Sequence, residues 1–331
     1  MSLLSLIVTL LLEQLQPLSA RKHLSGWLSD YAFFFQRHFN AGLRKQGKIA
    51  WLLAVLPLLA AVIALFWLLC RVHPVFALAF NVLVLYLTMG FRQFSHYFTD
   101  IHQALRDGNL DEARGLLSGW RGISSHELNA EEVARVTIEE ALRASQRNVF
   151  GVIVWFVLFG ALGLGGAAGA LLYRLGQFLR ARWGGGDDSE ELLAGHPSEA
   201  DAFGPDAFGP DTFGKFARQA FYLLEWLPVR LTAMTFAIVG DFENTIHCWR
   251  TQAASWPDPE AGILLASGAG ALGVRLGMPI PQGGSSLDRP ELGAGDEADT
   301  GFMQSAVGLV WRSVVFWMLL LLLLTLANLL G

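Results

Sequence analysis

The residues that could do chemistry are few, and none of them forms a recognised catalytic motif. His96 and His102 flank Asp100, but a metal site here is one ligand short of a convincing cluster. Residues 268–273 fit the G-x-G-x-x-G spacing, which binds dinucleotides only within an alternating strand and helix pattern. No such pattern surrounds them, so a dinucleotide site is not favoured there. The sequence also contains no G-x-S-x-G, Walker or H-E-x-x-H motif.

Arg230 is the charged residue with the most unusual position in the sequence. It interrupts an otherwise apolar run at 226–240. An arginine within such a run is costly in a membrane and is a functional-site hypothesis by default. The run itself fits a re-entrant helix, an interfacial helix or a membrane span with a buried arginine.

The two cysteines, Cys70 and Cys248, show no C-x-x-C or Cys/His ligand spacing. A structural zinc site is therefore not expected. Two isolated thiols are the default interpretation, and a disulfide between them stays open.

The elements that must position these residues are membrane helices. Of the 331 residues, 53% are hydrophobic and only 16% are charged, whereas soluble domains have about 25% charged residues. Runs long enough to cross an apolar layer of about 30 Å lie at 49–70, 74–91, 149–173 and 313–331. Each must be helical, because lipid leaves no other partner for the backbone. The sequence predicts an all-α fold, a polytopic membrane helix bundle with amphipathic helices in its loops.

The charge pattern divides the chain into segments. An excess of Lys and Arg between residues 14 and 48 places that segment in the cytoplasm, and the net charge of -5 argues against nucleic-acid binding. In chain order we predict an N-terminal apolar helix with a basic cytoplasmic segment (1–48), a transmembrane hairpin (49–91), a cytoplasmic helical loop (92–148), a transmembrane helix (149–173), a flexible acidic and repeat linker (174–215), a region of amphipathic or re-entrant helices (216–312) and a C-terminal transmembrane helix (313–331). The side of the membrane on which 174–312 lies stays open.

Two local patterns predict helix packing. Asn129 followed by Glu132 is typical of a capping box, and it begins a helix on which Glu139 and Arg143 stand four residues apart and can pair. We interpret this helix as solvated on one face and packed on the bundle by the other. Gly165 and Gly169 form a G-x-x-x-G pattern within 149–173, which predicts a close approach of another helix.

One stretch is more specific than these patterns. Residues 213–233 begin with Phe-Gly and close on Pro-Val-Arg-Leu-Thr-Ala, and they resemble a signature of the cobalamin-biosynthesis amide synthases, the CobD/CbiB family. Further segments resemble that family's elements in the same order, at 258–262, 270–277 and 289–293, with 111–114 and 128–139 fitting a helix that precedes a span. The resemblance covers most of the chain, and the region 216–312 carries the family signature.

The resemblance implies a multi-pass protein of the bacterial inner membrane. Family enzymes join an aminopropanol unit, or its phosphate, to a propionate side chain of the corrin ring, with ATP and a divalent metal. An active chain would then be an ATP-dependent acid–amine ligase that uses ATP and Mg. The acids and arginines that would have to converge on such a ligand pocket are Glu139, Glu225, Arg230, Asp241, Glu260 and Arg275.

The chain departs from the family where the family has metal-capable side chains. Between Phe213 and Pro228 the family usually has paired aspartates and an asparagine, whereas this chain has Phe221, Tyr222 and Glu225. We therefore interpret the chain first as a non-catalytic accessory or signalling protein similar to the AmpE-like branch, with no cofactor. Its partners would be the lipid bilayer and a membrane or cell-wall signalling protein.

The alternative is an adenosylcobinamide-phosphate synthase, which joins aminopropanol or its phosphate to adenosylcobyric acid. Binding of a corrinoid without turnover is compatible with the first interpretation. A transport role is a third alternative, but the spans lack the paired charges or the inverted repeat that it would need. The sequence assigns no catalytic residue.

Overall fold

The computed structural model describes residues 2–15, 21–40, 44–184 and 213–330, and it is almost entirely helical. The predicted all-α class is thereby confirmed. The described residues form two compact units. The first unit comprises those within 1–90 and 151–225, and the second comprises 91–150 and those within 226–331. The predicted repeat at 201–215 lies largely outside the described residues.

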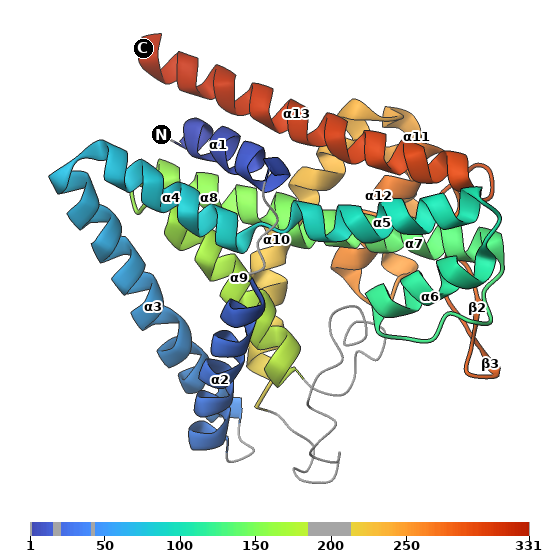
Figure 1. Cartoon of the computed structure of the whole chain (residues 1–331), viewed down its shortest axis with the longest axis horizontal. Coiled ribbons are helices and arrows are strands. Elements are labelled where there is room, and N and C mark those ends of the chain that lie inside the picture. The colour runs from blue at the N-terminus through green and yellow to red at the C-terminus, as the bar shows by residue number, and fades with distance from the viewer. Residues whose placement is uncertain (1, 16–20, 41–43, 185–212, 331) are drawn as a thin grey trace. The chain divides into compact units, whose positions relative to one another are not determined.

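The first unit is built from helices, most of them apolar (Figure 1). They are α1 (Ser2–Leu15), α2 (Arg21–Phe39), α3 (Arg44–Val72), α4 (Pro74–Thr88), α8 (Gly151–Ala161), α9 (Gly166–Trp183) and the beginning of α10 (Lys215–Val239). A tight turn joins α3 to α4, because Pro74 opens α4 and the His73 side chain accepts a hydrogen bond from the N–H of Val75 at 3.3 Å. Helices α3 and α4 both pack against α9.

Four described helices are long and apolar enough to cross a membrane. They span Lys45–Val72, Ala130–Ala161, Lys215–Val239 and Thr300–Ala327. The first and the last overlap the predicted spans at 49–70 and 313–331. The predicted span at 74–91 corresponds to α4, which has only 15 residues, fewer than the roughly 20 that a crossing helix needs.

The predicted single helix at 149–173 is wrong, because the chain breaks between α8 and α9. Gly163 and Gly165 there have φ of 74° and 86°, a backbone conformation that favours glycine. The Asn81 side chain accepts a hydrogen bond from the N–H of Ala167 at 3.1 Å, at the start of α9. Gly169 faces α8 so closely that a Cβ atom would lie 2.0 Å from the carbonyl oxygen of Trp155. The glycine pattern therefore combines a turn with close helix packing.

Helix α9 also corrects the predicted linker at 174–215. The helix continues to Trp183, whose indole N–H donates to the carbonyl of Ala32 on α2 at 3.2 Å. Trp183 is buried against Phe213, with ring centroids 5.1 Å apart. The apolar contacts of α9 extend its helix about ten residues beyond the end of the uncharged run.

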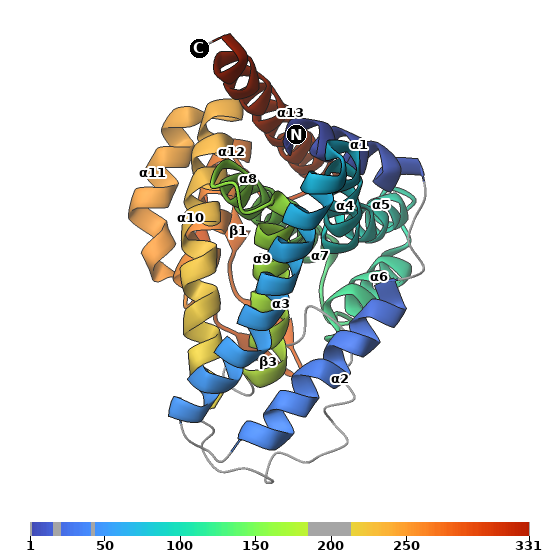
Figure 2. The same ribbon diagram turned by 90° about the vertical axis from the view of Figure 1, so that its left-hand side faces the viewer.

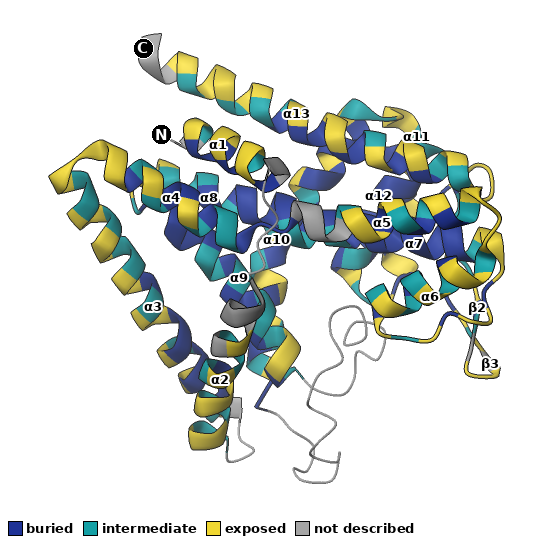
Figure 3. Cartoon of the chain, in the orientation of Figure 1, coloured by how far each residue is buried: buried dark blue, intermediate teal, exposed yellow. Residues whose placement is uncertain are grey.

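The second unit surrounds helix α7, which is buried along almost its whole length (Figure 3). Its other elements are α5 (Phe91–Arg106), α6 (Leu110–Arg121), α7 (Ala130–Ser145), the π-helical turn η1 (Gln146–Phe150), the end of α10, α11 (Phe242–Gln252), the 3₁₀ turn η3 (Ala253–Ser255), α12 (Pro259–Leu272) and α13 (Thr300–Leu330). Helices α5, α6, α12 and α13 pack against α7. The prediction that one face of α7 is solvated is therefore wrong.

Helices α11 and α12 lie side by side and run in opposite directions (Figure 2). Gly268 and Gly270 belong to α12, and Gly273 ends that helix with φ of 67°. A Cβ atom at Gly270 would lie 2.6 Å from the carbonyl oxygen of Asn244, and one at Gly268 would lie 2.6 Å from the side chain of Leu142. The G-x-G-x-x-G spacing thus serves helix packing and a helix end.

Two short antiparallel pairs follow α12. Strand β1 (Leu276–Gly277) pairs with β4 (Glu291–Leu292), and β2 (Ile280–Gln282) pairs with β3 (Ser285–Leu287). The backbone N–H of Gly284, in the turn between β2 and β3, donates to the carboxylate of Glu127 at 3.1 Å. Through α7 and these strands, the second unit brings charged side chains together.

Candidate functional site

A network of buried charges lies along α7 in the second unit. Arg135, Glu139, Glu140 and Arg143 each expose less than a tenth of their surface. The helix begins with the predicted capping box, because Asn129 accepts from the N–H of Glu132 at 2.8 Å and Glu132 accepts from the N–H of Asn129 at 2.7 Å. Buried charges are rare in proteins unless they are paired. The partners of these four residues therefore decide what the network can do.

Glu139 forms the most complete of these pairs, with Arg289. The guanidinium of Arg289 donates to both carboxylate oxygens, at 2.7 Å and 3.2 Å. Glu139 also accepts from the backbone N–H of Gly277 at 2.8 Å. Arg289 donates further to the carbonyl oxygens of Gly277, at 2.9 Å, and Met278, at 3.1 Å. The pair therefore holds the strand segment on α7 with most of its hydrogen-bonding capacity used.

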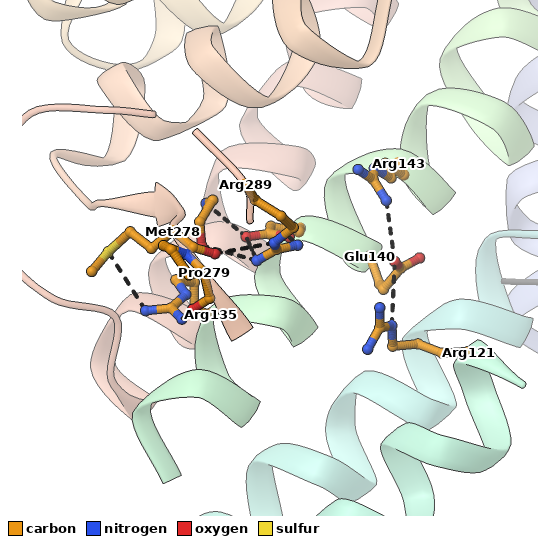
Figure 4. Close-up of polar contacts among 9 residues, drawn as sticks. Arg121, Arg135, Glu140, Arg143, Met278, Pro279 and Arg289 are labelled. Carbon is orange, nitrogen blue, oxygen red and sulfur yellow. Dashed lines mark hydrogen bonds and ion pairs between the residues drawn. The ribbon is translucent and has the colours of Figure 1, made fainter. Parts of the chain in front are cut away.

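Glu140 lies between two arginines (Figure 4). Its Oε1 atom is 3.4 Å from Arg143 on α7 and 3.9 Å from Arg121 at the end of α6. Burial lowers the pKa of the Arg121 guanidinium below its ordinary value, and the nearby carboxylate of Glu140 opposes that shift. One carboxylate thus serves two guanidinium groups.

Trp256 joins the two halves of the network. Its buried ring lies 5.8 Å from the guanidinium carbon of Arg143 and 5.7 Å from that of Arg289. Distances of this kind are within the range of cation–π attraction. Together, the network contains four guanidinium groups and two carboxylates, so an excess of two positive charges is buried in this part of the second unit.

Next to this network is a polar side chain without a partner. Gln146 exposes 1% of its surface, and neither its amide oxygen nor its amide nitrogen has a hydrogen-bond partner. The Nε atom of Arg143, three residues earlier, also has none. Gln146 begins the π-helical turn, and such turns occur frequently at functional sites. The network therefore offers positive charge and unused hydrogen-bonding groups, which suit a carboxylate or a phosphate.

A second ion pair in this unit connects α10 and α12. Arg230 donates to both carboxylate oxygens of Glu260, at 3.1 Å and 2.9 Å. Its guanidinium carbon lies 4.5 Å from the centroid of the Trp226 ring. The arginine in the apolar run thus has a buried carboxylate and an aromatic face as partners.

The structure brings two of the six predicted pocket residues into direct contact, namely Arg230 and Glu260. Glu139 pairs with Arg289 instead of Arg143. Asp241 caps α11 by accepting from the N–H of Asn244 at 3.0 Å. Glu225 belongs to the first unit, where it lies 3.4 Å from the hydroxyl of Tyr173 and 3.8 Å from Arg180. Arg275 pairs with Glu297 at 3.1 Å and Glu291 at 3.7 Å.

The described residues contain no group of three or more His, Cys, Asp or Glu side chains that could share a metal ion. His96 and Asp100 form an exposed pair on α5, at 3.1 Å. Both cysteines are free thiols, so the disulfide that the sequence left open does not form in this structure. Burial raises the pKa of the Cys248 thiol.

Sequence reasoning missed the partners that complete the network, Arg121, Arg135, Glu140, Arg289 and Trp256. Two signals could have found some of them. Arg289 opens the segment 289–293 that carried the family resemblance. Helix α7 has apolar residues around its circumference, including Val133, Val136 and Ile138, and such a helix is typically buried. Charges on it must then be buried too.

The fold and the apolar helices define a polytopic membrane protein with a charged, buried network in one unit. The family described as CobD/Cbib protein matches residues 4–192 and 210–310 of this chain. The chain therefore belongs to the CobD/CbiB family, and the resemblance found in the sequence is confirmed.

Curated relatives of the same family match most of this chain. The chain is 35% identical to a cobalamin biosynthesis protein CobD of Stutzerimonas stutzeri, over 96% of each chain. It is 35% identical to the CobD protein of Chromobacterium violaceum over 83% of this chain and 78% of that protein. A CbiB protein of Salmonella typhimurium is 24% identical, over 82% and 80% respectively. No solved structure matches the chain.

Proposed function

We propose that this chain acts in cobalamin biosynthesis as the amide-forming synthase, which the sequence left open as the alternative to a non-catalytic role. The observation that carries the proposal is the match to proteins named for cobalamin biosynthesis, over 96% of both chains in one case and over 83% of this chain in another. The names of these relatives support the biosynthetic interpretation more than an AmpE-like signalling role. The bond formed would be an amide between the amine of aminopropanol, or of its phosphate, and a corrin propionate.

The buried network is consistent with such a substrate pair. The propionate and the phosphate are both anions, and guanidinium groups bind such anions through two parallel hydrogen bonds. The excess of positive charge around Arg121 and Arg143 would stabilise an anion, and the unpartnered amide of Gln146 offers a donor and an acceptor beside it. These residues would bind and orient the acid, since amide formation needs the carboxyl carbon and the amine in contact.

The network does not fit a divalent metal. Glu139 and Glu140 already pair with arginines, and Mg²⁺ prefers carboxylate oxygens that are free to coordinate it. The ATP and Mg that the resemblance implies are part of this proposal, and they would supply the free energy of amide formation.

Complementation tests the proposed function. A bacterial strain that lacks the synthase is given this chain and grown where growth depends on its own cobalamin, and we expect growth to be restored. The Arg143→Gln variant should fail although it accumulates in the membrane, whereas Arg250→Gln, which removes an exposed arginine on α11, should restore growth. Failure of the wild-type chain, present at normal level in the membrane, would overturn the proposal.

The location in the bacterial inner membrane is part of the same proposal. It is supported by the four long apolar helices and by the membrane family. Separation of inner and outer membranes by density should recover the chain with inner-membrane markers. Recovery with the outer membrane would contradict it.

A further inference from the structure

The part of α10 that belongs to the second unit carries a stripe of exposed side chains. Trp226, Arg230, Met234 and Ile238 follow one another at intervals of four residues, so they lie on one face of the helix. Trp226 exposes 47% of its surface, Met234 53% and Ile238 54%, and the Arg230 side chain exposes 28%. Residues spaced in this way form a ridge that packs into a groove of another helix. We call these four residues the α10 stripe.

The α10 stripe lies within one of the four helices that are long and apolar enough to cross a membrane, Lys215–Val239. Residues 231–240 contain no charged side chain. At about 1.5 Å per residue, Asp241 lies about 16 Å along the helix from Arg230, which is about half the thickness of an apolar layer of about 30 Å. Arg230 is therefore far from the headgroups that receive an arginine near the end of a span.

Arg230 makes all of its hydrogen bonds to described residues through one guanidinium nitrogen. Its Nη1 atom donates to the two carboxylate oxygens of Glu260, at 3.1 Å and 2.9 Å, and to the carbonyl oxygen of Trp226 at 2.9 Å. Within the described part of the chain, the Nε and Nη2 groups make no hydrogen bond. Lipid tails cannot accept from these N–H groups, and polar groups without acceptors are costly in a membrane. The stripe therefore suits a protein surface better than lipid tails.

The ion pair with Glu260 removes the net charge that would otherwise keep two such stripes apart. Glu260 exposes 3% of its surface and lies 2.9 Å from Nη1 of Arg230. Two unpaired arginines brought together in an apolar layer would repel each other strongly. Two neutral arginine–glutamate pairs do not, so the same stripe of a second copy can approach without a further counter-charge.

The α10 stripe contains both members of a self-complementary interaction. The guanidinium carbon of Arg230 lies 4.5 Å from the centroid of the Trp226 ring, and the ring remains accessible because Trp226 exposes 47% of its surface. An aromatic ring has two faces, and its second face can receive another cation or N–H group. In a two-fold interface, residue i contacts j and j contacts i. A two-fold axis near Arg230 would therefore give each arginine the ring of the other copy.

We propose that the α10 stripe is a self-association surface, which binds the α10 stripe of a second copy of this chain within the membrane. Arg230 of each copy contacts the Trp226 ring of the other, and Met234 and Ile238 pack beside this contact. The inference goes beyond the proposed function and does not rest on it. The oligomeric state can be measured whether or not the chain restores cobalamin synthesis, so the two proposals fail separately.

The first experiment measures dimerisation of the full chain in lipid vesicles, by single-molecule photobleaching over a series of protein-to-lipid ratios. The wild type should form dimers, and Trp226→Leu should weaken the association about tenfold or more, because one cation–π contact is lost on each side. Trp311→Leu is the matched control, since Trp311 exposes 37% of its surface on α13, and it should dimerise like the wild type. Arg230 itself is kept, because its loss would leave Glu260 buried without its counter-charge.

The second experiment locates the surface by disulfide crosslinking in membranes, with copper phenanthroline as the oxidant. Single cysteines are placed in a chain that carries Cys70→Ala and Cys248→Ala. Met234→Cys, on the α10 stripe, should give a covalent dimer, because a disulfide forms only where two Cα atoms lie within about 7 Å. Leu323→Cys is the control on α13, where Leu323 exposes 64% of its surface, and it should stay monomeric on the gel.

Dimers that crosslink through Met234→Cys and that Trp226→Leu weakens support the proposal. A monomer at every protein-to-lipid ratio overturns it, as do dimers that crosslink only through Leu323→Cys or that Trp226→Leu leaves unchanged. Native mass spectrometry that finds a monomer with a retained lipid, lost in Trp226→Leu, would assign the stripe to a lipid and also overturn it. The thermal midpoint of Trp226→Leu is measured alongside, so that loss of association is not confused with loss of fold.

Discussion

Glu139 and Arg135 are buried one turn apart on the same helix, yet their surroundings differ. Glu139 has a two-fold hydrogen-bonded arginine and a backbone N–H as partners, whereas the hydrogen bonds of Arg135 among the described residues are two long ones, to a thioether and a carbonyl. A buried charge that has close hydrogen-bonding partners contributes to the stability of the fold, since removing its partner is destabilising. A buried charge without a close partner is a cost to the fold, which is retained where function needs it. The comparison separates a buried charge with close partners from one whose hydrogen bonds are long.

The largest effect is expected at the satisfied charge. The Glu139→Gln variant should lose about 3–5 kcal/mol of stability, because Arg289 is left buried without its counter-charge. Chemical unfolding in detergent micelles measures the loss. Glu243→Gln, at an exposed glutamate of α11, is the control and should change little. Equal stability of the two variants would show that the Glu139–Arg289 pair does not stabilise the fold.

A smaller loss is expected for Arg289→Lys. Lysine keeps the charge but cannot donate to Glu139, Gly277 and Met278 in one planar arrangement. We expect a loss of about 1–3 kcal/mol in the same unfolding experiment. The double variant with Glu139→Gln should lose less than the sum of the single losses, because the two residues share one interaction. Additive losses would contradict the pairing.

Arg275→Gln should change stability by less than about 1 kcal/mol, since its ion pairs are partly exposed. Thermal unfolding of the purified variant checks this. A loss as large as that of Arg289→Lys would mean that the ion pairs of Arg275 contribute to stability as much as the buried pair does.

The smallest effect on stability is expected for Arg135→Met. This variant tests most directly whether Arg135 differs from Glu139 in its contribution to the fold. Replacing a buried charge without a close partner by an apolar side chain of similar length should leave the thermal midpoint unchanged or raise it. Differential scanning calorimetry without ligand measures the midpoint. A marked decrease would show that Arg135 is structural, like Glu139.

Part of this architecture could be predicted from the sequence. Uncharged runs such as 49–70 predict helices because lipid satisfies no backbone group, and the capping box at Asn129 follows from local hydrogen bonding. The break at Gly163 and Gly165 was not predicted, because an apolar composition does not distinguish one long helix from two packed ones. The short 74–91 run was predicted as a span for the same reason.

The sequence by itself determined the helical class, the family and the residues of the signature, because these depend on composition, local periodicity and ordered motifs. Only the tertiary structure decided which charges meet. Glu139 and Arg289 are 150 residues apart in the chain, and no local pattern specifies a contact at that separation. Arg143 was expected to pair with Glu139 four residues away, yet it pairs with Glu140. Both carboxylate oxygens of Glu139 accept hydrogen bonds from Arg289 instead. This pairing results from the packing of α7 against the strand segment after α12, which brings Arg289 to Glu139.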